Sequence, residues 1–189
     1  MKNKRVKIVL NAPVILAFAA LCLIVTLLGI QSGGRILHNY FTTYRASLSS
    51  FWTYFRAFSH VLGHSGWAHF ANNMCYILLL GPMLEEKYGG KRIVGVILTT
   101  ALATAVINFI FFPSVGILGA SGVVFAFILL TSFTGFGSGE IPITFILVAA
   151  IYLGQEIING LIGADNISQM AHIIGGAVGA LAGWNWNRR

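Results

Sequence analysis

Long apolar runs with almost no charged residues recur along this chain and limit what it can fold into. A bilayer core takes roughly 20 apolar helical residues to cross, so each run predicts a transmembrane helix. Only 9% of the residues are charged and the mean hydropathy is +0.81, which excludes a soluble domain with a wetted surface. We therefore expect an all-α membrane protein in which residues 1–189 form a single domain of six transmembrane helices. The predicted spans are about 8–30, 69–84, 93–112, 119–134, 141–162 and 168–186.

The first apolar run follows a basic segment, residues 1–7, and could be a secretory signal peptide. Ala17-Phe18-Ala19 has the small-residue pattern of a cleavage site. The apolar run continues well past this point, however, and is longer than the roughly 7–15 residues of a signal-peptide core. We therefore interpret 8–30 as an uncleaved first span.

The distribution of lysine and arginine sets the orientation of the six spans. Loops that remain in the cytoplasm carry an excess of these two residues. With the N-terminus inside, the outer side holds only Arg35, Arg45 and Arg56 of the 12 Lys and Arg residues. We therefore expect a multi-pass protein of the plasma membrane with both termini in the cytoplasm. The net charge of +7 then follows from topology, and we expect no nucleic acid among the partners.

The longest polar stretch, residues 31–67, separates the first two predicted spans. It combines the three outer arginines with much of the aromatic content of the chain. Aromatic rings with a polar edge favour the level of the lipid headgroups. This composition predicts a long folded loop at the membrane interface between helices 1 and 2. Its aromatic residues include Tyr40, Phe41, Tyr44, Phe51, Trp52, Tyr54, Phe55 and Phe58.

The segment Gly119-Ala120-Ser121-Gly122, at the start of the fourth span, has two interpretations. Small residues are typical of close contacts between membrane helices, so packing is the simpler interpretation of the segment taken alone. A serine between glycines on a tight turn can also act as a nucleophile. The choice depends on which other polar residues lie at the same depth.

The predicted topology brings a few polar residues to one level of the membrane. Spans two, four and six all run from outside to inside, so their N-terminal ends share the outer side. His69 and Asn73 open span two. Ser121 opens span four, and His172 opens span six. A serine needs a base to accept its proton, and histidine is the commonest one, so we predict Ser121 as nucleophile and His172 as base.

Acyl transfer also needs hydrogen-bond donors for the developing oxyanion. Backbone N–H groups around Ser121 would be unpaired at a helix N-terminus, where they favour negative charge. Asn73 can add a side-chain amide, and His69 lies one turn earlier on the same face. Asn72 points about 100° away from that face, so Asn73 is the better candidate.

Gly175 and Gly179 follow His172 at spacings of three and seven residues, which predicts a close approach of span six to span four. Together, these segments resemble the rhomboid intramembrane serine proteases in their bacterial six-span form. The resemblance covers the chain from about residue 56 to residue 183. It is carried by Gly119-Ala120-Ser121-Gly122, His69-x-x-x-Asn73 and Ala171-His172-x-x-Gly175-x-x-x-Gly179.

The resemblance implies a serine endopeptidase that cleaves single-span transmembrane proteins near their extracytoplasmic end, within the lipid bilayer. It implies a Ser121–His172 catalytic dyad. It also implies transition-state stabilisation by the Ser121 backbone, Asn73 and His69, with Gly119 shaping the loop. The fifth span would act as a lateral gate for the substrate helix. No cofactor and no metal are implied.

Two positions depart from the family pattern. Phe55-Arg56 stands where many members carry a Trp-Arg pair. Phe125 replaces a tyrosine that often follows the serine by one turn. A phenylalanine ring can still pack on His172, although the hydroxyl group is lost.

Other polar residues allow alternative hypotheses. His60 and His64 could bind a metal, but no carboxylate nearby completes a site, so we expect structural hydrogen bonds. Glu156, within the fifth span, is a candidate for gating or for catalysis because an acid at such depth is costly. Asp165 lacks a partner aspartate for an aspartyl protease. Glu85 is interpreted as part of a charged cytoplasmic helix end.

The functional alternative to a protease is a non-proteolytic multi-span membrane protein, either a transporter or a pseudoprotease that binds helices. The intact Ser121 and His172 argue against a pseudoprotease. The sequence has no apparent inverted repeat, which argues against a transporter. The substrate sequence and the oligomeric state are left open.

Overall fold

The computed structural model describes residues 9–134 and 166–187, with side chains of the second segment from residue 169, and scattered positions between 143 and 158. Within these residues the chain is all-α, as expected, apart from one isolated backbone bridge between Thr43 and Ile117. The expected fifth span, 141–162, lies largely outside the described residues. The elements are α1 (Pro13–Gln31), α2 (Arg35–Tyr40), α3 (Phe51–Ser59), the 3₁₀ turn η1 (His60–Leu62), α4 (Trp67–Tyr88), α5 (Gly90–Phe111), α6 (Ser121–Ser132) and α8 (Asn166–Asn187).

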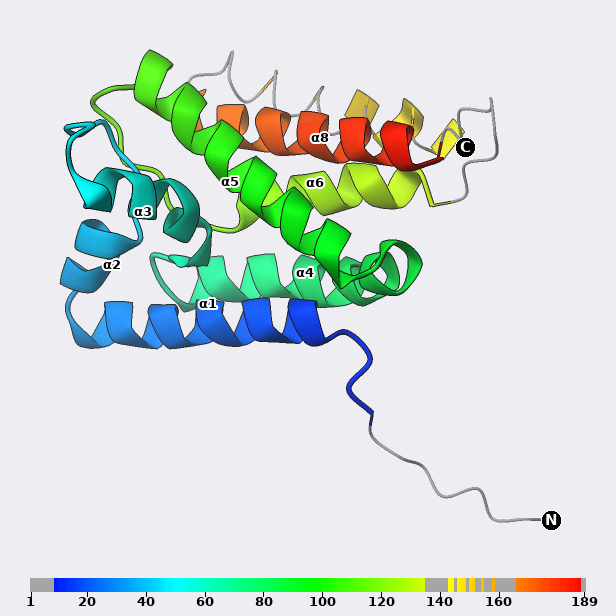
Figure 1. Ribbon diagram of the computed structural model, residues 1–189, viewed down its shortest axis with the longest axis horizontal. Coiled ribbons are helices and arrows are strands. Elements are labelled where there is room, and N and C mark those ends of the chain that lie inside the picture. Colours follow the sequence, from blue (N-terminus) through cyan, green and yellow to red (C-terminus); the bar gives the residue numbers. More distant parts are fainter. Residues whose placement is uncertain are drawn as a thin grey trace.

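The long helices form one bundle (Figure 1). α4, α6 and α8 run in one direction, whereas α1 and α5 run in the other. α6 and α8 lie side by side and make the most extensive helix contact in the described part of the chain. α2 and α3 cover the end of the bundle at which α1 ends and α4 begins. The common direction of α4, α6 and α8 agrees with the one predicted for spans two, four and six.

The ends of the helices differ somewhat from the limits of the apolar runs. α1 begins at Pro13, whose ring suits the first turn of a helix. α4 continues to Tyr88, past its last apolar run, and stops at Gly89, which has a φ of +85°. α6 begins at Ser121 and has only 12 residues. At 1.5 Å per residue it is about 18 Å long, against about 33 Å for the 22 residues of α5.

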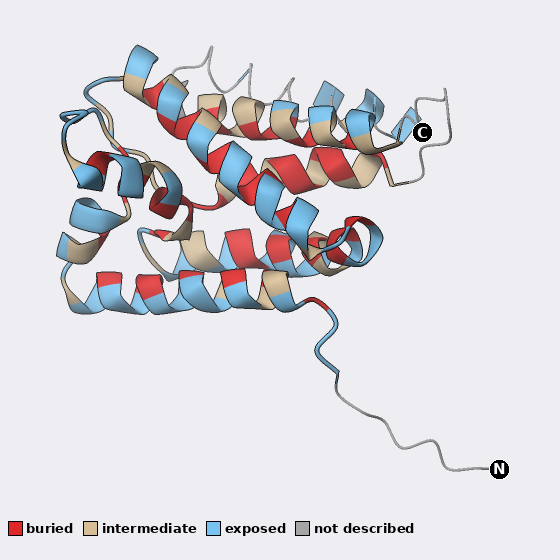
Figure 2. Cartoon of the chain, in the orientation of Figure 1, coloured by how far each residue is buried: buried red, intermediate tan, exposed pale blue. Residues whose placement is uncertain are grey.

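Many residues on the outer surface of the bundle are exposed (Figure 2), and large apolar residues are common among them. On α1, Leu21 and Ile24 are 49% and 52% exposed, and on α5 Ile110 is 57% exposed. Soluble proteins rarely expose continuous apolar surface of this kind, whereas a lipid environment favours it. α1 and α5 are also long and apolar enough to cross a bilayer. Both features are those of a membrane protein.

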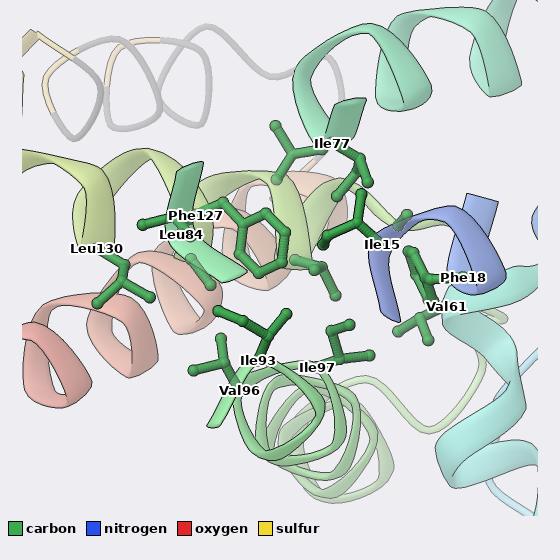
Figure 3. Packing of buried hydrophobic residues seen from close by; sticks show 14 of the residues in the cluster. Ile15, Phe18, Val61, Ile77, Leu84, Ile93, Val96, Ile97, Phe127 and Leu130 are labelled. Carbon is green, nitrogen blue, oxygen red and sulfur yellow. The ribbon is translucent and has the colours of Figure 1, made fainter. Parts of the chain in front are cut away.

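The interior is a continuous apolar core where α1, α4, α5 and α6 meet (Figure 3). Ile15 of α1, Ile77 of α4 and Ile93 of α5 are fully buried in it. Phe127 of α6 lies in the same cluster and is also fully buried. This core holds α6 against α4 and α5, so the start of α6 occupies a defined place.

Arg56 organises the segment between α1 and α4. Its guanidinium lies 4.3 Å from the centroid of the Tyr44 ring and donates to the Asn39 carbonyl at 3.3 Å. The side chain is buried, at 6% exposure. The neighbouring Phe55 packs edge-on against Trp52, with centroids 5.7 Å apart. Phenylalanine at this position therefore keeps aromatic contacts in the folded segment.

Glu85 caps the first helix from a distant part of the sequence. Its carboxylate accepts hydrogen bonds from the N–H groups of Val14 and Ile15, both at 3.0 Å. These groups lie in the first turn of α1, where a helix offers no acceptor of its own and its dipole favours negative charge. Glu85 is only 7% exposed. It is thus a buried cap for another helix, and the interpretation of Glu85 as part of a charged helix end was incomplete.

We predict that Glu85→Ala destabilises the protein by about 1–3 kcal/mol, because two N–H groups lose their acceptor. Glu86→Ala removes the adjacent carboxylate, which is exposed, and should change the stability by less than about 0.5 kcal/mol. Unfolding in detergent micelles, followed by circular dichroism, measures both effects. Equal effects of the two substitutions would contradict the capping role.

Candidate active site

The turn that precedes α6 is built around Gly119. Its φ of +126° lies in a region that favours glycine. Its N–H donates to the His60 carbonyl at 2.9 Å. A Cβ at this position would lie 2.8 Å from Cε1 and Nε2 of His69. Gly119 therefore shapes the turn and makes room for the His69 ring, while its own N–H is engaged elsewhere.

Ser121 is the first residue of α6 and is half-buried. The Val124 N–H donates to the Ala120 carbonyl at 2.9 Å, which begins the hydrogen-bond ladder of the helix. The N–H groups of Ser121 and Gly122 precede this ladder, and the helix dipole favours negative charge beside them. These N–H groups beside the serine hydroxyl are therefore suited to binding an anion.

α8 runs parallel to α6 at backbone contact. A Cβ on Gly175 would collide with the carbonyl oxygen of Gly122, and a Cβ on Gly179 would collide with that of Ala126. Both helices advance by one turn between these two contacts, so they keep one register. A Cβ on Gly122 would in turn lie 3.3 Å from the carbonyl oxygen of Ala171. The predicted close approach of spans four and six is confirmed.

This register brings His172 to the level at which α6 begins, because His172 lies one turn before Gly175. The His172 imidazole stacks face to face on the Phe125 ring, with centroids 4.2 Å apart and planes 4° apart. Phe125 follows Ser121 by one helical turn and so lies on the same face of α6. The expected packing of Phe125 on His172 is confirmed. The stack holds the imidazole on the Ser121 face of α6.

α4 contributes His69 and Asn73 from one face, with Asn73 buried and Asn72 exposed. The Ser65 hydroxyl lies 3.2 Å from Nδ1 of His69. With this hydroxyl as donor, the neutral ring carries its proton on Nε2, on the edge that faces Gly119. Nδ2 of Asn73 donates to the His69 carbonyl at 3.1 Å. This bond uses one of the two amide hydrogens and leaves the second for another acceptor.

The candidate site thus draws on the N-terminal parts of three parallel helices, α4, α6 and α8. The His69 ring lies against Gly119, just before the start of α6, and the His172 ring lies on Phe125, one turn after Ser121. Glu156 and Asp165, together with the expected gate formed by the fifth span, lie outside the described residues.

His60 and His64 make structural hydrogen bonds, as expected. Nδ1 of His60 lies 3.1 Å from the Arg56 carbonyl, and Nδ1 of His64 lies 3.2 Å from the Leu62 carbonyl. Burial lowers the pKa of both imidazoles to about 4, and the nearby His69 contributes to the lowering for His64. Both rings are therefore neutral at pH 7 and add no charge to the site.

A buried polar stripe on α5 was missed by the sequence-based prediction. Thr100, Thr104 and Asn108 are each at most 4% exposed. A Cβ on Gly122 would lie 3.3 Å from Cγ2 of Thr100 and 3.6 Å from Oγ1 of Thr104, so the stripe faces the start of α6. Nδ2 of Asn108 donates to the Val115 carbonyl at 3.0 Å and ties α5 to the segment before α6. The available signal was the spacing of four residues between polar side chains in an apolar helix.

The fold and the candidate site together define the class of protein. It is a helical membrane bundle with a serine at the N-terminus of one helix and a histidine on the parallel neighbouring helix. Residues 51–189 match the family model of the Rhomboid domain. Because this match covers most of the chain, the chain belongs to the rhomboid family.

Two curated relatives agree with this assignment. The chain is 26% identical over 176 residues to Rhomboid protease GlpG of Haemophilus influenzae, with 89% of this chain and 88% of that protein covered. It is 30% identical over 128 residues to RHOMBOID-like protein 4 of Arabidopsis thaliana, with 64% of this chain covered. The match spans only 31% of the plant protein, which is much longer.

Gly175→Ala is expected to destabilise the protein by about 1–3 kcal/mol, since the added methyl group meets the Gly122 backbone, which cannot move aside. Gly176→Ala serves as the matched control, because its methyl group would lie 3.7 Å from the Leu129 side chain in an ordinary contact. Thermal unfolding in detergent compares the two variants. If both alanines lowered the midpoint alike, the contact between α6 and α8 would not be the tight constraint described above.

Proposed function

We propose that the chain is an intramembrane serine endopeptidase with Ser121 as nucleophile and His172 as general base. Two observations together carry this proposal: the parallel glycine contact of α6 and α8, and the stack of His172 on Phe125. This arrangement supports a position of the imidazole near the Ser121 hydroxyl. The family assignment and the relative named as a protease support the same reaction class.

In the proposed reaction, His172 accepts the proton of the Ser121 hydroxyl as its oxygen attacks the scissile carbonyl carbon. The negative charge that develops on the carbonyl oxygen is stabilised by the Ser121 N–H, the Asn73 amide and Nε2–H of His69. The imidazolium then protonates the leaving amine, and an acyl-enzyme remains. Water, deprotonated by His172, hydrolyses this ester and regenerates the Ser121 hydroxyl.

We further propose a single membrane domain of six spans with both termini in the cytoplasm. The common direction of α4, α6 and α8 supports this topology. A hydrocarbon core is about 30 Å thick, so a helix of about 18 Å such as α6 cannot reach both of its surfaces. The Lys87 ammonium donates to the Thr134 carbonyl, just past the inner end of α6, so with the Ser121 end directed outward the nucleophile lies below the outer surface. Such a depth suits cleavage of a transmembrane segment near its extracytoplasmic end.

The proposed substrates are single-span transmembrane proteins. A helical peptide bond keeps its carbonyl within the hydrogen-bond ladder of the helix, so the substrate must unwind locally before Ser121 reaches it. Glycine and proline lower the cost of this unwinding. Substrates with small or helix-breaking residues near the cleavage site should therefore be preferred.

Ser121→Ala and His172→Ala should each abolish cleavage of a single-span substrate in detergent while leaving the unfolding midpoint close to that of the wild type. A fluorophosphonate probe should label Ser121 in the wild type, and His172→Ala should lose the labelling. Cleavage by Ser121→Ala at the wild-type rate would contradict the proposal. A folded wild-type protein that neither cleaves nor reacts with the probe would favour the alternative of a helix-binding pseudoprotease.

Asn73→Ala should lower kcat by a factor of about 10²–10³, because the amide stabilises the oxyanion, with a smaller effect on KM. Asn72→Ala is the matched control, since Asn72 is the adjacent and exposed asparagine on the same helix. Steady-state cleavage of one substrate by both variants measures the difference. An unchanged kcat in Asn73→Ala would remove this residue from the site.

A further inference from the structure

A cavity of about 630 Å³ opens between α2 and the segment that precedes α6, and we refer to it as the outer cavity. Its lining includes His38, Tyr44, Arg45, Ser65, Ser114 and Leu118. The proposed dyad and oxyanion site use none of these side chains directly.

The outer cavity lies next to the proposed reaction site. The hydroxyl of Ser65, on its wall, is 3.2 Å from Nδ1 of His69. Leu118, also on its wall, precedes Ser121 by three residues, which span at most about 10 Å of extended chain. A substrate whose scissile carbonyl lies at Ser121 therefore passes the cavity with the residues of its outer flank.

The segments that form the outer cavity carry positive charge without a counterion of their own. Residues 32–66 and 112–120 contain three arginines and no Asp or Glu. Of these three arginines, Arg45 alone lines the outer cavity. It is exposed, with its guanidinium 5.5 Å from the centroid of the Phe109 ring, whereas Arg56 is buried. Arg45 is thus the arginine that the cavity presents to a ligand.

We propose that the outer cavity binds an acidic side chain in the extracytoplasmic flank of the substrate. This inference rests on the proposed protease function. Arg45 supplies the selecting charge, because a guanidinium binds a carboxylate through two parallel N–H donors. The substrate class is therefore single-span proteins with Asp or Glu a few residues outward from the cleavage site. A substrate bound at Ser121 must pass the wall of the outer cavity, whereas a lipid headgroup is not held near the cavity by the reaction site. A peptide carboxylate is therefore the occupant.

The test uses the full chain in a nonionic detergent and two single-span substrates that differ only in the outer flank, one with aspartate and one with lysine. The wild type should cleave the aspartate substrate with a kcat/KM about three- to tenfold higher. Arg45→Gln should remove this preference, and Arg45→Glu should reverse it. Arg35→Glu is the matched control, since Arg35 is exposed in the same segment but does not line the cavity. It should keep the wild-type preference.

Equal rates for the two substrates in the wild type, or a preference that survives Arg45→Glu, would overturn the inference. A rate that rises with phosphatidylglycerol in the micelle and ignores the flank would overturn it as well and assign the cavity to a lipid headgroup. Fluorophosphonate labelling of Ser121 separates the two proposals. A labelled enzyme that is indifferent to flank charge refutes the outer cavity alone, whereas an unlabelled protein that cleaves neither substrate refutes the protease function and the inference with it.

Discussion

The contact between α6 and α8 is the constraint on which the rest of the candidate site depends. In lipid, helices gain little from burying apolar side chains against each other, and close backbone packing supplies the attraction instead. Gly175 and Gly179 bring α8 onto the carbonyl oxygens of α6, so neither helix can slide without a collision. The level of His172 relative to Ser121 follows from this register.

The other buried polar groups hold turns and helix ends. The His60 carbonyl binds the Gly119 N–H, and the Asn108 amide binds the carbonyl of Val115. At the opposite end of the bundle, Glu85 holds the first turn of α1. Each of these bonds pairs a backbone group that the helices leave unsatisfied. The apolar core between them then positions the helices themselves.

Much of the fold could be predicted from the sequence, because hydropathy is a local property. Apolar runs located α1, α4, α5, α6 and α8 to within a few residues. The stack of Phe125 on His172 was predictable because both residues belong to motifs in a recognisable order. Partners that are distant in the sequence could not be predicted in this way. Nothing near Glu85 indicates that it caps α1, and the stripe at Thr100 lies within an ordinary apolar run.

The sequence by itself determined that the chain is an all-α membrane protein with the motifs of one family, since composition and motif order require no knowledge of packing. Only the tertiary structure decided which atoms each small residue meets. Gly122 lies against the backbone of α8, whereas Gly119 adopts a positive φ and makes room for His69. The sequence does not show these neighbouring atoms, because they belong to helices that are distant along the chain.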